Sequence, residues 1–106
     1  MGKIGVILLD RFEDMDYLEP SEVLKDRGYE LIHVGLKEGL TVRGRQGSTQ
    51  VKIDQSVRDV SADTFDALLI PRGYTLDIIK EVKDVVELVK DFLESGKPVW
   101  RETPKF

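Results

Sequence analysis

The N-terminal stretch, residues 2–20, constrains the fold more than any other part of the chain. It begins with an almost unbroken apolar run, Lys3 to Leu9, that contains isoleucine and valine. Such a run is typical of a strand that is buried on both faces, as in a parallel sheet. Carboxylates then gather where the positive end of a helix dipole favours them, and they are Glu13, Asp14, Asp16 and Glu19. The stretch predicts the first strand and helix of an open α/β sheet, in which ligands bind at the carboxyl ends of the strands.

Strand and helix signals alternate along the rest of the chain. A helix is expected from Glu13 to Arg27, and Pro20 is expected to kink it or restart it. Further strands are expected at Tyr29–Leu36, Phe65–Ile70 and from Pro98 to Trp100, and a hairpin at Leu40–Ile53. A loop is expected over 54–64 and a short helical passage over 76–83. The last helix is expected to run from Asp84 to Gly96, with Asp84 and Glu87 at the spacing of a capping box. The expected apolar stripes are Met15, Leu18, Val23 and Leu24 in the first helix, and Val85, Val86, Val89, Phe92 and Leu93 in the last. The alternation predicts a doubly wound α/β fold.

Composition excludes several classes of function. A chain of 106 residues with 41% hydrophobic residues is expected to form one domain with one modest core. The net charge of −4 argues against a nucleic-acid partner. No apolar run is long enough to span a membrane and the N-terminus lacks a signal-peptide pattern, so a cytoplasmic protein is expected. Without cysteine there is no thiolate nucleophile and no cysteine-based metal site, and no cofactor is predicted. The residue usage fits a thermophile.

Five segments carry a resemblance to a known family. They are FEDMDYLEP at Phe12–Pro20, LKDRGYELIHVGL at Leu24–Leu36, TVRGRQGSTQVKID at Thr41–Asp54, FDALLIPRG at Phe65–Gly73 and VVELVKDFLESGKPV at Val85–Val99. In this order and spacing the chain resembles the DJ-1/PfpI family within the class I glutamine-amidotransferase-like fold. The resemblance implies that residues 1–106 form a single three-layer α/β sandwich. It would have a flavodoxin-like parallel sheet and a β-hairpin, and would lack the family's C-terminal part.

The resemblance also implies where a catalytic site would lie, and the chain departs from the family at each position. Relatives place a cysteine at the sharp turn after the strand that the GKPV segment opens, and here that position falls on Thr103. The glutamate that contacts the nucleophile corresponds to Asp16. The first glycine of a Gly-Gly pair, which supplies an oxyanion hole, is replaced by Arg72, and only Gly73 remains. We therefore expect no catalytic residue, and a vestigial pocket formed by Asp16, Arg72 and Gly73.

The chain is expected to depart from the family before or at this nucleophile turn. Glu102 would occupy a position where the family buries an aliphatic residue, and an unpaired buried carboxylate is costly. The strand pattern is therefore predicted to end at about Trp100. Thr103 is a weak nucleophile candidate, because a threonine hydroxyl needs a base to activate it and the sequence offers none at this turn.

The charged residues near this corner allow two interpretations each. Arg72 either pairs with Asp16 or Glu13 or binds an anion, and we favour the ion pair. Asp10, Glu13, Asp14 and Asp16 carry oxygen ligands of the kind that a hard cation prefers. A helix start that complements the dipole is favoured, and no metal site is predicted. His33 is expected to be a strand residue with its own hydrogen-bond partner. A solvated face is expected for Arg43, Arg45 and Lys52.

Two functions from different classes remain open. The first is a non-catalytic relative that acts, if at all, through self-assembly or partner binding. The second is a hydrolase of the family's peptidase or glyoxalase/deglycase type that uses a non-cysteine or partner-supplied group, with an unidentified small-molecule substrate. Self-association is expected because the strand from Pro98 would form an exposed sheet edge. A two-fold dimer is the commonest outcome, with Val99, Trp100 or Phe106 buried against a neighbour.

Overall fold

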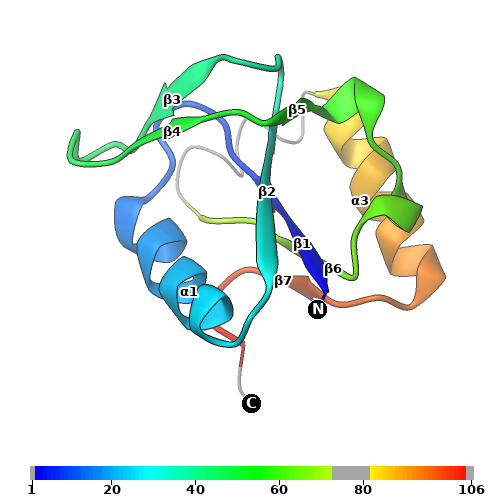
Figure 1. The fold of residues 1–106 in the computed structure, drawn as a ribbon. Helices are drawn as coiled ribbons and strands as arrows, with labels where there is room; N and C mark the ends of the chain where they lie inside the picture. The colour runs from blue at the N-terminus through cyan, green and yellow to red at the C-terminus, as the bar shows by residue number, and fades with distance from the viewer. Residues whose placement is uncertain (1, 73–81, 105–106) are drawn as a thin grey trace.

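The computed structural model describes residues 2–72 and 82–104, and its centre is a parallel sheet (Figure 1). The five strands have the order β5–β2–β1–β6–β7. They are β1 (Lys3–Ile7), β2 (Glu30–Gly35), β5 (Gln55–Ser56), β6 (Ala67–Leu69) and β7 (Val99–Trp100). Strand β1 pairs with β2 on one side and with β6 on the other. The prediction of a first strand buried on both faces is confirmed.

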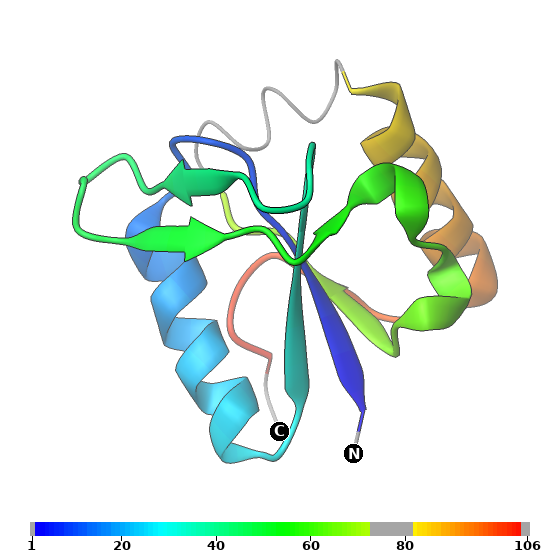
Figure 2. The same ribbon diagram turned by 45° about the horizontal axis from the view of Figure 1, so that its top comes forward.

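Helices cover both faces of the sheet. Helix α1 (Asp14–Asp26) packs on one face and α3 (Lys83–Ser95) on the other, so the molecule has three layers (Figures 1 and 2). Two 3-10 helices, η1 (Val57–Asp59) and η2 (Ala62–Thr64), contact α3. The predicted three-layer α/β sandwich is confirmed. No helix in the described ranges 2–72 and 82–104 is long and apolar enough to cross a membrane.

The core consists of two apolar clusters, one on each face of the sheet. Side chains alternate along β1, so that Ile4 and Val6 join the cluster under α1, whereas Ile7 joins the cluster under α3. Phe92 is completely buried in the second of these clusters. The two residues of β7 also divide between the clusters, Trp100 toward α1 and Val99 toward α3.

The expected hairpin is present, and it packs on the side of the sheet that α1 covers. Its strands are β3 (Thr41–Arg43) and β4 (Gln50–Lys52), which pair antiparallel. Val42 and Val51 belong to the cluster under α1, and Figure 2 shows the hairpin lying across the start of that helix. A bridge between Phe12 and Gly44 joins the hairpin to the turn after β1.

Four local predictions need correction. Helix α1 runs through the buried Pro20, so of the two expected outcomes, a kink or a restart, the restart does not occur. Its Met15 is 58% exposed, whereas Tyr17, which was not in the expected stripe, faces the core together with the predicted Leu24. The segment after the hairpin, expected to be a loop, adds the short edge strand β5 by pairing with the end of β2. Helix α3 begins one residue before Asp84, at Lys83, and its N-cap Val82 makes no side-chain capping bond.

The apolar stripe of α3 is narrower than expected. Only Val85, Leu88 and Phe92 are buried, whereas Leu93 is 62% exposed. The sheet covers only one side of α3. The predicted stripe also included residues on a neighbouring side, which the sheet does not bury. The helix ends as predicted at Gly96, which adopts a left-handed φ of 80°. The helical passage expected over residues 76–83 falls mainly on residues 76–81, which lie outside the described residues.

Candidate functional site

The topology places a crevice between the carboxyl ends of β1 and β6. From β1 the chain continues to β2 and β5 on one side of it, and then crosses to β6 and β7 on the other side. Connections therefore leave β1 and β6 in opposite directions, which is where open α/β sheets bind ligands. The two loops touch at this point, since the backbone N–H of Glu13 donates to the carbonyl of Arg72 at 3.0 Å.

A shallow pocket of about 450 Å³ lies at this corner, between the start of α1, the end of β6 and the segment after β7. Its lining residues are Met15, Asp16, Glu19, Pro20, Arg72, Glu102 and Thr103. The structure thus brings together Asp16, Arg72 and Thr103, which the sequence singled out. Gly73 lies outside the described residues. The carboxylate of Glu19 was not assigned to the pocket from the sequence, although its position one turn after Asp16 places it on the same side of the helix.

The segment after β7 does not continue the strand. Strand β7 ends at Trp100, as the sequence predicted. Glu102 is exposed and Thr103 is half-buried, and both line the pocket. Glu102 therefore avoids the buried position that the family's strand pattern would give it.

Arg72 and Asp16 form the predicted ion pair. The Nε of Arg72 donates to Oδ2 of Asp16 at 3.1 Å. The arginine side chain is 54% exposed and the aspartate 20%. The guanidinium thus lies against the carboxylate that the resemblance assigns to contact with a nucleophile.

Replacing Arg72 by glycine is expected to enlarge this pocket at little cost in stability. Partly exposed ion pairs contribute up to about 1 kcal/mol, so we expect the free energy of unfolding to fall by no more than that. Urea denaturation measures the change, and Arg72→Lys, which keeps the charge, is the matched control. A loss of more than about 2 kcal/mol would show that Arg72 has a structural role beyond the pair.

Three other carboxylates near this corner, those of Asp10, Glu13 and Asp14, have partners in the hairpin. Asp10 accepts a hydrogen bond from the N–H of Arg43 at 3.0 Å, and Glu13 pairs with the Arg45 side chain at 3.3 Å. Asp14 accepts hydrogen bonds from the N–H of Gln46 at 2.8 Å and from Ser48 Oγ at 3.1 Å. Within residues 2–72 and 82–104, no group of three or more His, Cys, Asp and Glu side chains is arranged to hold a metal ion. The acidic residues at the start of α1 therefore anchor the hairpin. From the sequence they were expected only to complement the helix dipole.

Asp14 is the most deeply buried of these carboxylates, with 2% of its surface exposed. Burial alone would raise its pKa, but the hydrogen bonds from the N–H of Gln46 and from the hydroxyls of Thr49 and Ser48 outweigh burial, so that the pKa lies below the usual 3.8. Gly44 leaves the space that the carboxylate occupies, because a Cβ there would overlap Asp14. The only sequence signal for this site was the turn GRQGS at residues 44–48.

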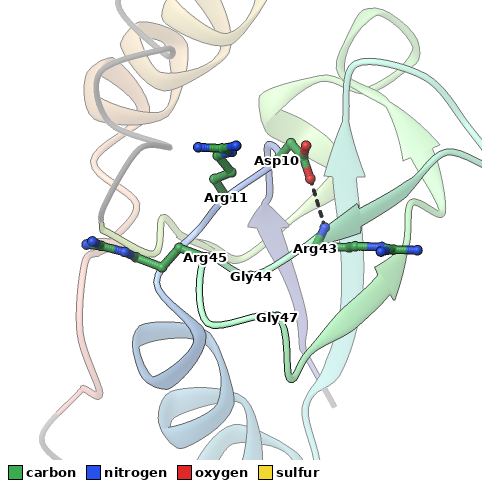
Figure 3. A pocket seen from close by; sticks show the side chains of 6 residues that line it. All are labelled: Asp10, Arg11, Arg43, Gly44, Arg45 and Gly47. Atoms are coloured by element: carbon green, nitrogen blue, oxygen red, sulfur yellow. Dashed lines mark hydrogen bonds between the residues drawn. The ribbon is translucent and has the colours of Figure 1, made fainter.

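A second hollow of about 450 Å³ lies between the turn after β1 and the hairpin (Figure 3). Its lining residues are Asp10, Arg11, Arg43, Gly44, Arg45 and Gly47. Arg11 has an unusual φ of 68° for a residue other than glycine. Figure 3 shows that the side chains of Arg11 and Arg45 extend to one side and that of Arg43 to the other. The three guanidinium groups thus do not converge on one point. Arg43, Arg45 and Lys52 are exposed, as expected for a solvated face, and Arg45 in addition pairs with Glu13.

His33 has hydrogen-bond partners on both ring nitrogens, which confirms the prediction that it has one. Its Nε2 lies 2.8 Å from the hydroxyl of Tyr17, and its Nδ1 lies 3.1 Å from Oδ2 of Asp54. A neutral ring that donates from Nδ1 to Asp54 accepts the Tyr17 proton at Nε2. Burial lowers the pKa of His33 below 6.5; Asp54 acts in the opposite direction, and Lys25 adds to the lowering.

Stability is expected to decrease as the pH falls below about 6.5. Because the pKa of His33 is lower in the folded protein, the unfolded chain binds the proton more readily. The contribution of neutral His33 is present above the unfolded pKa of 6.5 and is lost as the pH falls through the folded pKa. Urea denaturation between pH 8 and pH 5 measures this dependence. The variant His33→Gln should flatten the curve in this window, and an unchanged slope in that variant would contradict the prediction.

Comparison with known proteins places the chain in a family. Residues 2–101 match the DJ-1/PfpI family. The chain is 42% identical over 101 residues to General stress protein 18 of Bacillus subtilis (strain 168), and 38% identical over 98 residues to Protein/nucleic acid deglycase 2 of Escherichia coli (strain K12). These alignments cover 94% and 92% of the chain. The protein belongs to the DJ-1/PfpI family.

A solved structure supports the same assignment. A two-domain protein of Anabaena variabilis, with DJ-1/ThiJ/PfpI-like and ferritin-like domains, superposes with a TM-score of 0.90 and is 26% identical in sequence. The superposition covers 93% of this chain and 28% of the Anabaena chain. The chain spans 59% and 57% of the lengths of the Bacillus and Escherichia relatives.

Proposed function

We propose that this chain is a non-catalytic DJ-1/PfpI domain that acts through self-assembly. The observation that carries the proposal is the composition of the corner pocket. Thr103 lines it at the position where the resemblance expects a cysteine, and Asp16 beside it is engaged by Arg72. The sequence contains no cysteine that could replace the missing thiol.

The two bases considered for Thr103, His33 and Asp16, both have other partners. A threonine hydroxyl becomes nucleophilic only when a base removes its proton. The single histidine of the sequence, His33, is bound to Tyr17 and Asp54 and does not line the pocket. The carboxylate of Asp16 already accepts a hydrogen bond from the Arg72 guanidinium.

Activity assays test the proposal directly. The protein should turn over neither methylglyoxal nor a peptide substrate, and Protein/nucleic acid deglycase 2 is assayed beside it for comparison. Turnover that is abolished by Thr103→Ala or Asp16→Ala would overturn the non-catalytic function. Turnover that survives both substitutions would overturn it as well and would place the chemistry elsewhere.

The second candidate function is an enzyme of the family's peptidase or glyoxalase/deglycase type. The openness of the pocket favours it, since Arg72 is 54% exposed and Glu102 is exposed at the rim. A group from another polypeptide has access to this rim. This function predicts a specific activity that rises with protein concentration and that disappears in Asp16→Ala.

Self-assembly has its structural support at the edge of the sheet. Among the strands of residues 2–72 and 82–104, β7 stands last in the order, with β6 as its neighbour, and Val99 and Trp100 are half-buried. Strand edges of this kind invite pairing with another chain. Phe106, the third expected contact, lies outside the described residues. Sedimentation velocity at tens of micromolar should show a dimer, and a monomer with the fluorescence of a fully hydrated Trp100 would refute self-assembly.

A further inference from the structure

Helix α3 carries a second apolar row besides the one that faces the sheet. Its inner row, Val85, Leu88 and Phe92, is buried. The outer row consists of Val86, Val89 and Leu93, at the spacing i, i+3 and i+7 that aligns side chains on one flank of a helix. Val86 and Val89 are half-buried, and Leu93 is 62% exposed.

The outer row lies on the flank of α3 that faces away from the two 3-10 helices. Asp84 faces η1, where its carboxylate lies 3.9 Å from Arg58 Nε. At about 100° per residue, Leu93 projects from the opposite side of the helix. Val89 packs against the same core cluster as Val99 of β7. The outer row is therefore adjacent to the sheet edge for which self-assembly is proposed.

Charged residues along the exposed ridge beside this row alternate in sign. They are Lys83, Glu87, Lys90 and Glu94, and all four are exposed. Reversing the direction of the helix exchanges every positive position with a negative one. A second copy that runs antiparallel thus places its Glu94 opposite Lys83 and its Lys90 opposite Glu87. In a parallel two-fold pair the two ridges would lie on opposite sides of the contact, so these charges would not pair.

We infer that the outer row of α3 docks against the outer row of α3 in a second copy of this chain, antiparallel and about a two-fold axis near Val89. In this arrangement Val86 meets Leu93 of the second copy, and the alternating charges pair on the rim. Such self-complementarity is what an isologous two-fold interface requires. A partner with charges of one sign would meet repulsion at half of the ridge. This inference rests on the proposed self-assembly and specifies its surface.

Charge reversal gives a test that leaves the apolar row intact. The acidic variant carries Lys83→Glu and Lys90→Glu, and the basic variant carries Glu87→Lys and Glu94→Lys. Because like charges then face each other, the dimer dissociation constant of each variant alone should be at least about tenfold higher than that of the wild type. An equimolar mixture of the two should recover the wild-type association. All four positions are exposed, and thermal unfolding of each variant verifies that it folds.

Cross-linking tests the direction of the helices, because the natural chain has no cysteine. Positions 83 and 94 of one helix lie about 16 Å apart along its axis. In the antiparallel pair, Lys83→Cys should form a disulfide efficiently only when it is mixed with Glu94→Cys. Efficient cross-linking of Lys83→Cys with itself would overturn the antiparallel arrangement.

The outcomes separate this inference from the proposed function. If the wild type is a monomer at tens of micromolar, both the self-assembly and the α3 interface are refuted. If the wild type associates and Leu93→Glu abolishes the association while the fold is kept, the α3 interface is supported. If association is unchanged in Leu93→Glu and in both charge variants, the α3 interface is wrong and self-assembly stands through another surface.

Discussion

Replacing Asp14 by alanine is expected to lower the free energy of unfolding by about 3 kcal/mol, because the hydrogen bonds that this buried carboxylate accepts from the hairpin turn would be lost. The carboxylate is 2% exposed and accepts from the N–H of Gln46 and from Ser48 Oγ. These donors belong to the hairpin turn, so the substitution should also loosen the turn from α1. Urea denaturation measures the loss, and amide hydrogen exchange at Gln46 should become faster.

Two matched variants control this prediction. Asp16→Ala removes a carboxylate from the same helical turn, but Asp16 belongs to a partly exposed pair and should cost no more than about 1 kcal/mol. Asp14→Asn keeps an acceptor oxygen and should fall between the wild type and Asp14→Ala. A loss in Asp14→Ala no larger than that in Asp16→Ala would contradict the anchoring role.

The pKa of Asp14 gives the same site a signature in acid. Its folded pKa lies below the usual 3.8, so the carboxylate contributes stability that is present above that value. This contribution is lost as the pH falls through the folded pKa. In Asp14→Asn, acid unfolding below about pH 3.8 should therefore be less steep, in a window well separated from that of His33.

Replacing Gly44 by alanine is expected to cost about 2 kcal/mol, within the range of overpacked cores. A Cβ at this position would overlap the carboxylate of Asp14. The added methyl group must displace the carboxylate from its donors or push the hairpin away from α1. Gly47→Ala in the same turn is the control: its Cβ would meet nothing within 4 Å, and its cost should come only from the left-handed φ of 77°.

A double-mutant cycle connects these two predictions. In an Asp14→Ala background the overlap disappears, so Gly44→Ala should cost much less than in the wild type. The coupling energy between the two positions should exceed about 1 kcal/mol, as is usual for side chains in contact. Gly47→Ala should cost the same in both backgrounds. Strict additivity of Asp14→Ala and Gly44→Ala would show that the two residues do not compete for the same space.

Prediction from the sequence worked best where a pattern is local. The apolar run of β1, the alternation in the hairpin and the glycine that ends α3 each depend on the preferences of neighbouring residues. The ion pair between Arg72 and Asp16 spans 56 positions of the chain, and it was foreseen only because the family topology places the end of β6 beside the start of α1.

The misassigned helix faces show the limit of such patterns. Met15 and Leu93 fit an apolar period, yet both are exposed. The period shows that a helix has an apolar side, but the width of that side depends on how much of it the sheet covers. Tyr17, which was left out of the stripe, is buried against Phe12 with ring centroids 5.5 Å apart.

By itself the sequence determined the family and, apart from β5, the order of the strands along the chain, since both depend on residue identity and spacing. Only the tertiary structure decided what the acidic corner does. Asp14 and its donor Gln46 are 32 positions apart, and no local pattern links a helix start to a hairpin turn. Their contact exists because β1 delivers α1 to the same end of the sheet at which β2 delivers the hairpin, where a buried carboxylate needs donors and a turn has N–H groups to offer.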